Sequence, residues 1–196
     1  MPLNLPNLLT WLRIALVPLF VVVFYLPDGW LQAQSLNVVA TGIFALAAIT
    51  DWLDGWLARR LNQTSAFGAF LDPVADKLMV AAALIVLVDL DRAGVAASLI
   101  IIGREIAISA LREWMAKVGR SHSVAVSFFG KLKTTAQMAA ILLLLYHAPI
   151  GPLSAQWLGR WLLDIAAFLT LWSMLHYLFQ AWRDLRGQTV HELTNR

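Results

Sequence analysis

Long apolar stretches separated by short polar turns dominate the pattern along this chain. Six segments approach the roughly 20 apolar residues that a helix needs to cross a bilayer. We predict helices near residues 6–26, 36–60, 69–90, 94–116, 124–148 and 158–182. Turn residues mark the breaks, namely PDG at 27–29, NQTS at 62–65, DLDRAG at 89–94, GRSHS at 119–123 and APIGP at 148–152. The pattern predicts an all-α integral membrane protein with six transmembrane helices and a single domain over residues 1–196.

Composition excludes several other classes of protein. Of the 196 residues, 60% are hydrophobic and only 14% are charged, and the mean hydropathy of +0.69 is far from that of a soluble domain. The absence of cysteine excludes disulfides, thiolate metal sites and a cysteine nucleophile. No basic run with interleaved aromatic residues is present, so we expect no nucleic-acid partner. The start of the chain lacks the basic region of a signal peptide, which predicts a retained first helix.

Basic residues orient the predicted bundle, because Lys and Arg near the ends of membrane helices tend to stay in the cytoplasm. The opposite connections contain only Arg92 and Arg160. Most basic residues follow the second, fourth and sixth predicted helices: Arg59, Arg60, Arg112, Lys117, Arg120, Arg183, Arg186 and Arg196. We therefore expect both termini in the cytoplasm and the intramembrane charges in the cytoplasmic half of the bilayer.

Four aspartates form two stripes on consecutive predicted helices. Asp51 and Asp54 lie within about 60° of each other on a helix, and Asp72 and Asp76 are only about 40° apart. An ionisable group at membrane depth costs about 2.5–3.5 kcal/mol on insertion scales, so a layer of such groups indicates a functional site. Four adjacent carboxylates would repel one another unless cations neutralise them.

Two divalent cations would balance the four negative charges. Carboxylate oxygens without thiolate or imidazole suit hard ions, which favours Mg²⁺ and leaves Mn²⁺ open. Gly55, Ala58 and Gly68 would leave room for a ligand near the backbone, and Arg59 would supply a charge suited to phosphate. Small residues on membrane helices also mediate helix packing, so either role fits each of them taken alone.

The eight positions together form the string D-x2-D-G-x2-A-R-x8-G-x3-D-x3-D over residues 51–76. This string resembles the defining motif of the CDP-alcohol phosphatidyltransferases. The resemblance implies a six-helix fold, two metal ions and a homodimer. It also implies that the first three aspartates bind metal, and that Asp76 binds metal and acts as the general base. It places Gly55, Arg59 and Ser65 at the nucleotide, with Ala58 and Gly68 beside the CDP-lipid, and brings Thr10 and Arg13 to the donor diphosphate or cytidine.

Three flanking stretches narrow the resemblance to bacterial members of the family that use CDP-diacylglycerol and glycerol 3-phosphate. They are NLPNLLTWLRI at 4–14, FGAFLDPVADK at 67–77, and GREIAISALREWMA with SVAVSFFGKLKTTAQM within 103–138. The resemblance implies formation of phosphatidylglycerol phosphate and CMP at the cytoplasmic face of the bacterial inner membrane.

An anionic acceptor such as glycerol 3-phosphate needs cationic groups beside the metals. Arg104 and Arg112 lie about 80° apart on the fourth predicted helix and are candidates to bind its phosphate. Lys131 and Lys133 lie about 160° apart, so both cannot point into one pocket, and Lys131 is the weakly favoured one. The alternative is that these basic residues pair with Glu105 or with lipid headgroups.

Two other functions stay open from the sequence. The same chemistry could use serine, inositol phosphate or a second phosphatidylglycerol as the acceptor. A cation transporter or channel would instead use the carboxylates as an ion path. That class predicts acidic residues spread through the membrane depth, whereas here they cluster at one depth.

Overall fold

The computed structural model describes residues 5–27, 29–61, 66–117 and 128–194, and of residues 176–194 it describes only the backbone. These residues form six helices: α1 Leu5–Val23, α2 Ala33–Leu61, α3 Ala66–Asp89, α4 Val95–Lys117, α5 Phe128–Tyr146 and α6 Ala155–Thr194. The described ranges contain no β-strand. The prediction of an all-α protein with six helices is therefore confirmed, and three of the five predicted turns fall between the observed helices.

The helix ends differ from the predicted ones, most of all in α6. This helix continues to Thr194, whereas the sequence predicted its end near residue 182. The predicted ends followed the apolar span, but the segment after residue 182 is polar and charged and still forms helix. The apolar span therefore predicted only the part of α6 that could cross a membrane, and not the whole helix. The predicted turns at 62–65 and 119–123 lie outside the described residues.

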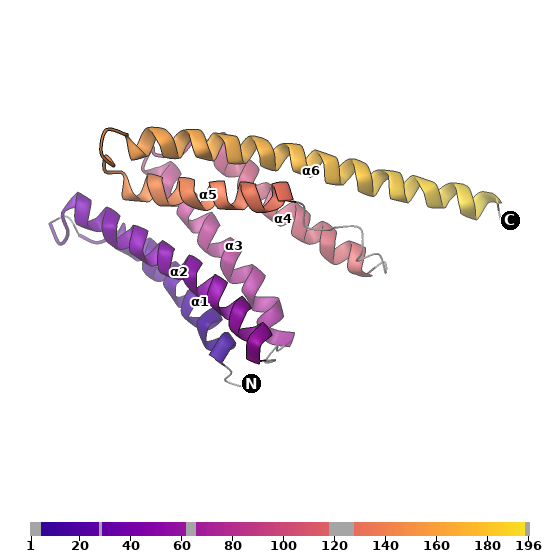
Figure 1. Ribbon diagram of the computed structural model, residues 1–196, viewed down its shortest axis with the longest axis horizontal. Coiled ribbons are helices and arrows are strands. Elements are labelled where there is room, and N and C mark those ends of the chain that lie inside the picture. Colours follow the sequence, from indigo (N-terminus) through magenta and orange to yellow (C-terminus); the bar gives the residue numbers. More distant parts are fainter. Residues whose placement is uncertain (1–4, 28, 62–65, 118–127, 195–196) are drawn as a thin grey trace.

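The helices pack as two groups that contact each other (Figure 1). In the first group α1 packs on α2 and α3, and in the second α6 packs on α5 and α4. α5 also contacts α2 and α3, and α3 contacts α4. The chain reverses after each helix, so the C-terminal half of α2 and the N-terminal halves of α1 and α3 lie at one end of the bundle.

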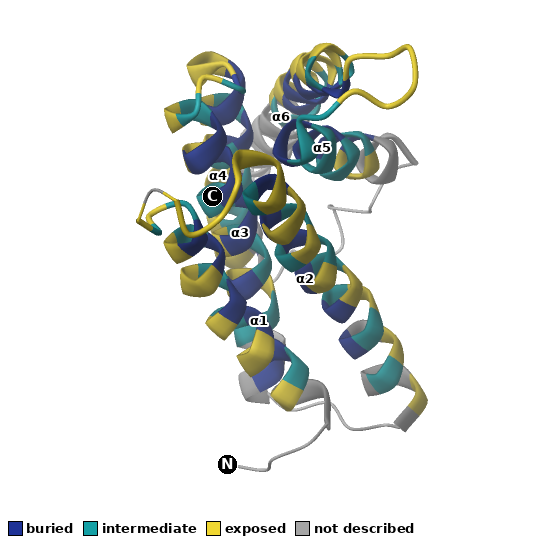
Figure 2. Cartoon of the chain, turned by 90° about the vertical axis from the view of Figure 1, so that its left-hand side faces the viewer, coloured by how far each residue is buried: buried dark blue, intermediate teal, exposed yellow. Residues whose placement is uncertain are grey.

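Burial divides each helix into an inner and an outer face (Figure 2). Phe20, Phe44, Leu84, Ile141 and Leu144 are almost completely buried in one core, where the ring centroids of Phe20 and Phe44 lie 6.4 Å apart. Large apolar side chains are exposed on the outer faces of five helices: Leu19, Ile49, Ile85, Leu99, Phe168 and Trp172 are examples. Soluble proteins rarely expose so much apolar surface, and a lipid surrounding explains it.

Among the described residues, two stretches are long and apolar enough to cross a membrane by length and composition. Ala33–Asp54 has a mean hydropathy of 1.6 and Ala155–Leu175 one of 1.3. The apolar parts of α1 and α5, Leu8–Val23 and Lys133–Tyr146, are shorter. Charged residues interrupt the apolar sequence of the other two helices. α3 contains Asp72, Asp76 and Lys77, and α4 contains Arg104 and Glu105. These findings fit a membrane protein, while six spans and the position of the termini stay predictions.

Arg92 and Arg160, the two basic residues in the connections expected outside the cytoplasm, both bond within the protein. Arg92 Nη1 donates to Asn37 Oδ1 at 2.9 Å and to the carbonyl of Leu145 at 3.2 Å. Burial lowers the pKa of Arg92 below its usual value. Arg160 donates to the carbonyls of Asp91 and Arg92. Arg92 and Arg160 therefore have a structural role in these connections. This role accounts for the two basic residues that the expected orientation places outside the cytoplasm.

Candidate active site

The aspartates of α2 meet an arginine from α1. Nη1 of Arg13 donates to Asp51 Oδ1 at 2.7 Å, and Nη2 of the same residue forms an ion pair with Asp54 Oδ2. The side chains of Arg13 and Asp54 are only 1% and 4% exposed, whereas that of Asp51 is 43% exposed. The two carboxylates thus share one cation, and the site opens on the side of Asp51.

Asp72 joins α3 to α1 through a hydroxyl group. Thr10 Oγ1, which is buried one helical turn before Arg13, donates to Asp72 Oδ1. Gly68, one turn before Asp72 on α3, is buried as well. α1 therefore contacts three of the four aspartates that the motif predicted, two through Arg13 and one through Thr10.

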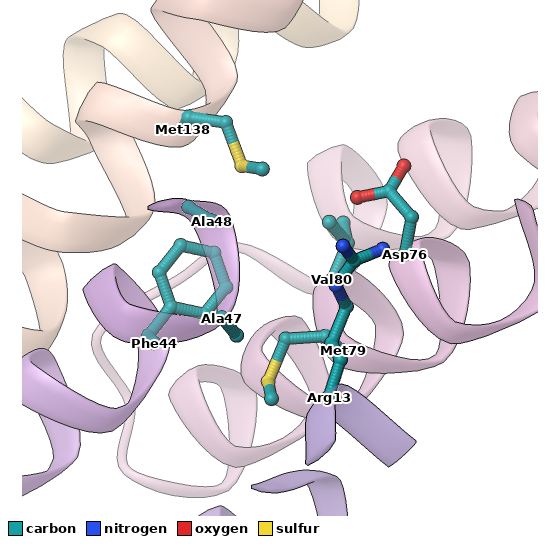
Figure 3. Close-up of a pocket in the computed structure, with 8 residues that line it drawn as sticks. All are labelled: Arg13, Phe44, Ala47, Ala48, Asp76, Met79, Val80 and Met138. Atoms are coloured by element: carbon teal, nitrogen blue, oxygen red, sulfur yellow. The ribbon is translucent and has the colours of Figure 1, made fainter. Parts of the chain in front are cut away.

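The fourth aspartate lies close to the same arginine. Asp76 and Arg13 both line a small cavity of about 10 Å³, together with Phe44 of α2 and Met138 of α5. The view with side chains as sticks places the Asp76 carboxylate beside the Arg13 guanidinium (Figure 3). The cavity has room for about one water molecule. The four aspartates are thus brought together around Arg13 at one end of the helices α1 to α3.

Basic groups on α3 and α4 form a second part of the site. Lys77 follows Asp76 directly and donates to Ser109 Oγ on α4. Arg104 is buried and forms an ion pair with Glu105, while its Nε has no hydrogen-bond partner in the described part of the chain. The alternative in which Arg104 pairs with Glu105 is therefore observed, and this pairing leaves some of its donors for another ligand.

Lys133 is the other candidate for the acceptor whose side chain is described. It is 3% exposed and its Nζ donates to Ser173 Oγ of α6 at 3.2 Å. This contact ties α5 to α6, as expected for whichever of the two lysines has a packing role. The structure describes only the backbone of five other predicted site residues: Gly55, Ala58, Arg59, Arg112 and Lys131. Ser65 lies outside the described residues. The roles of these residues stay predictions.

The donor set fits a hard divalent cation. It consists of carboxylates from Asp51, Asp54, Asp72 and Asp76, the oxygen ligands that Mg²⁺ and Mn²⁺ prefer. Within the described ranges no three acidic or histidine side chains are already spaced around a common metal position. The Arg13 guanidinium contacts two of the four carboxylates instead.

The sequence did not predict that Arg13 pairs with the aspartates. Its expected partner was the donor diphosphate or cytidine, because only the resemblance had suggested a role for it. A signal was available: an arginine on an apolar helix needs a counter-ion, and the nearest intramembrane acids were those of the motif. The contact of Lys77 with Ser109 was not predictable either, because it depends on how α3 and α4 cross.

Comparison with known proteins shows the family of this chain. The sequence profile of the CDP-alcohol phosphatidyltransferase family matches residues 3–172. A protein of Salmonella typhimurium (strain LT2) named CDP-diacylglycerol--glycerol-3-phosphate 3-phosphatidyltransferase is 51% identical over 190 residues, which cover 96% of this chain and all of that protein. Proteins of the same name from Escherichia coli (strain K12) and Shigella flexneri are each 50% identical over the same shares. This chain therefore belongs to the CDP-alcohol phosphatidyltransferase family.

Proposed function

We propose that this protein transfers the phosphatidyl group of CDP-diacylglycerol to glycerol 3-phosphate, forming phosphatidylglycerol phosphate and CMP in bacterial phospholipid biosynthesis. The observation that carries this proposal is the convergence of the motif aspartates around Arg13 and Thr10 at one end of the bundle. The name shared by relatives at about half identity over nearly the whole chain supports the reaction and both substrates.

Asp51, Asp54, Asp72 and Asp76 would hold two divalent cations, with Mg²⁺ favoured and Mn²⁺ also suitable. Such ions would neutralise charge on the donor diphosphate and on the leaving phosphate, as metals do in phosphoryl transfer. The carboxylate-only donor set and the high exposure of Asp51 support this assignment, because the diphosphate can approach from the open side. Gly55, Ala58 and Gly68 would leave space for the CDP group, with Arg59, Ser65 and Thr10 as its polar partners.

Asp76 would act as the general base. Its carboxylate would take the proton from the 1-hydroxyl of glycerol 3-phosphate, whose oxygen attacks the phosphorus that carries the diacylglycerol. The bond between that phosphorus and the oxygen of the CMP phosphate breaks, and CMP leaves with the electron pair. Asp76 lies beside Arg13 and one helical turn from Asp72, and this position at the edge of the four aspartates supports its role as the base.

The phosphate of the acceptor would be bound by basic residues next to Asp76. Arg104 is the best supported of these, because it is buried and only part of its donor set is used by Glu105. Arg112 and Lys131 complete the proposed group. Lys133 bonds Ser173 and ties α5 to α6, which favours Lys131 as the lysine that faces the acceptor.

A membrane setting completes the proposal. The six helices would span the bacterial inner membrane among its lipids, with both termini and the site facing the cytoplasm, where CMP and glycerol phosphate are soluble. The exposed apolar faces of the helices support the membrane setting. The resemblance to the family implies a homodimer.

Assaying CMP release against a panel of acceptors tests the choice of glycerol 3-phosphate. The purified protein in detergent, given CDP-diacylglycerol and Mg²⁺, should release CMP with glycerol 3-phosphate at least about tenfold faster than with serine, inositol phosphate or phosphatidylglycerol, because only a matched anion completes the basic site. Faster release with another acceptor would identify a different member of the family. No release with any acceptor, together with cation flux in liposomes, would indicate a transporter.

A further inference from the structure

Arg13 carries a buried charge that faces carboxylates instead of solvent. It is 1% exposed, and its two terminal nitrogens each contact a different aspartate of α2. A guanidinium keeps its positive charge in proteins at any working pH. Helix α1 therefore delivers one fixed positive charge to the two carboxylates that begin the motif.

The guanidinium of Arg13 bonds carboxylates, whereas a structural arginine elsewhere in the protein bonds backbone carbonyls. Its Nε has no hydrogen-bond partner among the described residues. Arg92, a partly buried arginine with a structural role, bonds the carbonyls of Leu144 and Leu145 at the end of α5 as well as Asn37. Arg13 is instead held by Asp51 and Asp54, and Figure 3 shows its guanidinium beside the carboxylate of Asp76.

A divalent cation bound to Asp51 and Asp54 would compete with Arg13 for their negative charge. Asp51 Oδ1 and Asp54 Oδ2 each accept a hydrogen bond from a guanidinium nitrogen of Arg13. A guanidinium and a divalent cation repel each other at contact distance, and the repulsion is strong in a medium of low dielectric constant. Both cannot bind this pair of carboxylates in the same way. A divalent cation held by these carboxylates would therefore weaken the contacts of Arg13 with them.

We propose that Arg13 is the internal counter-ion of Asp51 and Asp54: it holds the two carboxylates together and competes with divalent cations for their negative charge. The inference rests on the proposed function, because it takes these aspartates as metal ligands. Without either cation the pair would be two like charges in an apolar bundle, a costly arrangement. Arg13 thus stabilises the fold when no metal is bound and lowers the affinity of the two carboxylates for metal.

Replacing Arg13 by methionine tests the proposal with two readings that do not depend on activity. Mn²⁺ binding to the full-length protein in detergent is measured from the free Mn²⁺ signal in electron paramagnetic resonance. The thermal midpoint is measured by the fluorescence of the nine tryptophans, in EDTA and in Mg²⁺. Arg13→Met should bind Mn²⁺ roughly 5- to 150-fold more tightly than the unmodified protein, the usual range for coupled sites. Its thermal midpoint should fall in EDTA and recover in Mg²⁺.

Arg92→Met is the matched control, because Arg92 is a partly buried arginine with no carboxylate partner among the described residues. It should lower the thermal midpoint equally in EDTA and Mg²⁺ and leave Mn²⁺ affinity unchanged. Arg13→Lys keeps the charge and should bind Mn²⁺ nearly as the unmodified protein does.

Three results would overturn the inference. They are unchanged or weaker Mn²⁺ binding by Arg13→Met, an equal loss of thermal stability with and without Mg²⁺, and failure of this variant to fold even in Mg²⁺. If the unmodified protein itself binds no Mn²⁺, the metal assignment in the proposed function fails instead.

Discussion

Asp76→Asn should reduce CMP release by about 10²- to 10⁴-fold, the contribution typical of a positioned general base. Asparagine has nearly the same size and keeps one oxygen for a metal, but its amide cannot take the proton from the acceptor hydroxyl. Asp76 is only partly buried and asparagine has nearly its size, so the substitution should leave folding intact. The measurement is the rate of CMP release with saturating substrates, together with the thermal midpoint and the binding of CDP-diacylglycerol.

Asp164→Asn provides the matched control. Asp164 lies on α6, at a cavity lined also by Asp91 and Arg160, and takes no part in the proposed site. The same chemical change there should leave the rate within about twofold of that of the unmodified protein, as surface substitutions usually do. An Asp76→Asn protein that retains more than about one tenth of the normal rate would contradict its role as the base.

Asp51→Asn should reduce CMP release by about 10²-fold or more, because metal-assisted charge stabilisation contributes several kcal/mol. Its effect on folding should be small for two reasons visible in the structure. The carboxylate is 43% exposed, and Arg13 keeps Asp54 as its buried partner. Raising the Mg²⁺ concentration should restore part of the rate, because the lost ligand weakens metal binding without removing the other carboxylates.

Asp54→Asn separates the two roles of these carboxylates. Asp54 is only 4% exposed, so its loss leaves the buried Arg13 charge poorly compensated. This variant should lose activity and also show a lower thermal midpoint in EDTA, whereas Asp51→Asn should lose activity alone. Equal thermal midpoints for the two variants would contradict the greater structural role expected of Asp54. Normal activity of Asp51→Asn would show that Asp51 is not a metal ligand.

Hydrophobic length and turn chemistry were enough to predict the helices. The segments PDG, DLDRAG and APIGP combine residues that disfavour helix with polar groups, and each lies between two observed helices. The end of α6 could not be predicted in this way. Polar residues beyond Trp182 continue the helix because their local propensity permits it, and the apolar pattern carries no information about them.

The carboxylate stripes could be predicted because they depend only on helical spacing. Asp51 and Asp54 both reach one guanidinium, which requires them to share a face of α2 as their separation indicated. The guanidinium itself could not be assigned from spacing. It lies 38 and 41 residues away from these partners in the chain, so the contact depends on how α1 crosses α2.

The basic half of the site was the less predictable part for a similar reason. Arg104 and Glu105 are neighbours in sequence, and their pairing was one of the alternatives that the sequence left open. The partner of Lys133 is Ser173, 40 residues further along the chain and on another helix. Angles on one helix indicated that Lys131 and Lys133 point apart, but only the packing of α5 on α6 shows what Lys133 contacts.

Removal of the metal tests the central claim most directly. The purified protein is given CDP-diacylglycerol and carbon-13-labelled glycerol 3-phosphate, and labelled phosphatidylglycerol phosphate is quantified by mass spectrometry in Mg²⁺, after EDTA treatment, and after Mg²⁺ is returned. We predict product in Mg²⁺, a loss of about 10³-fold or more in EDTA, and full recovery on return of Mg²⁺. Product formed at the same rate in EDTA, or no labelled lipid in Mg²⁺, would contradict the four-aspartate, metal-dependent transfer proposed for this protein.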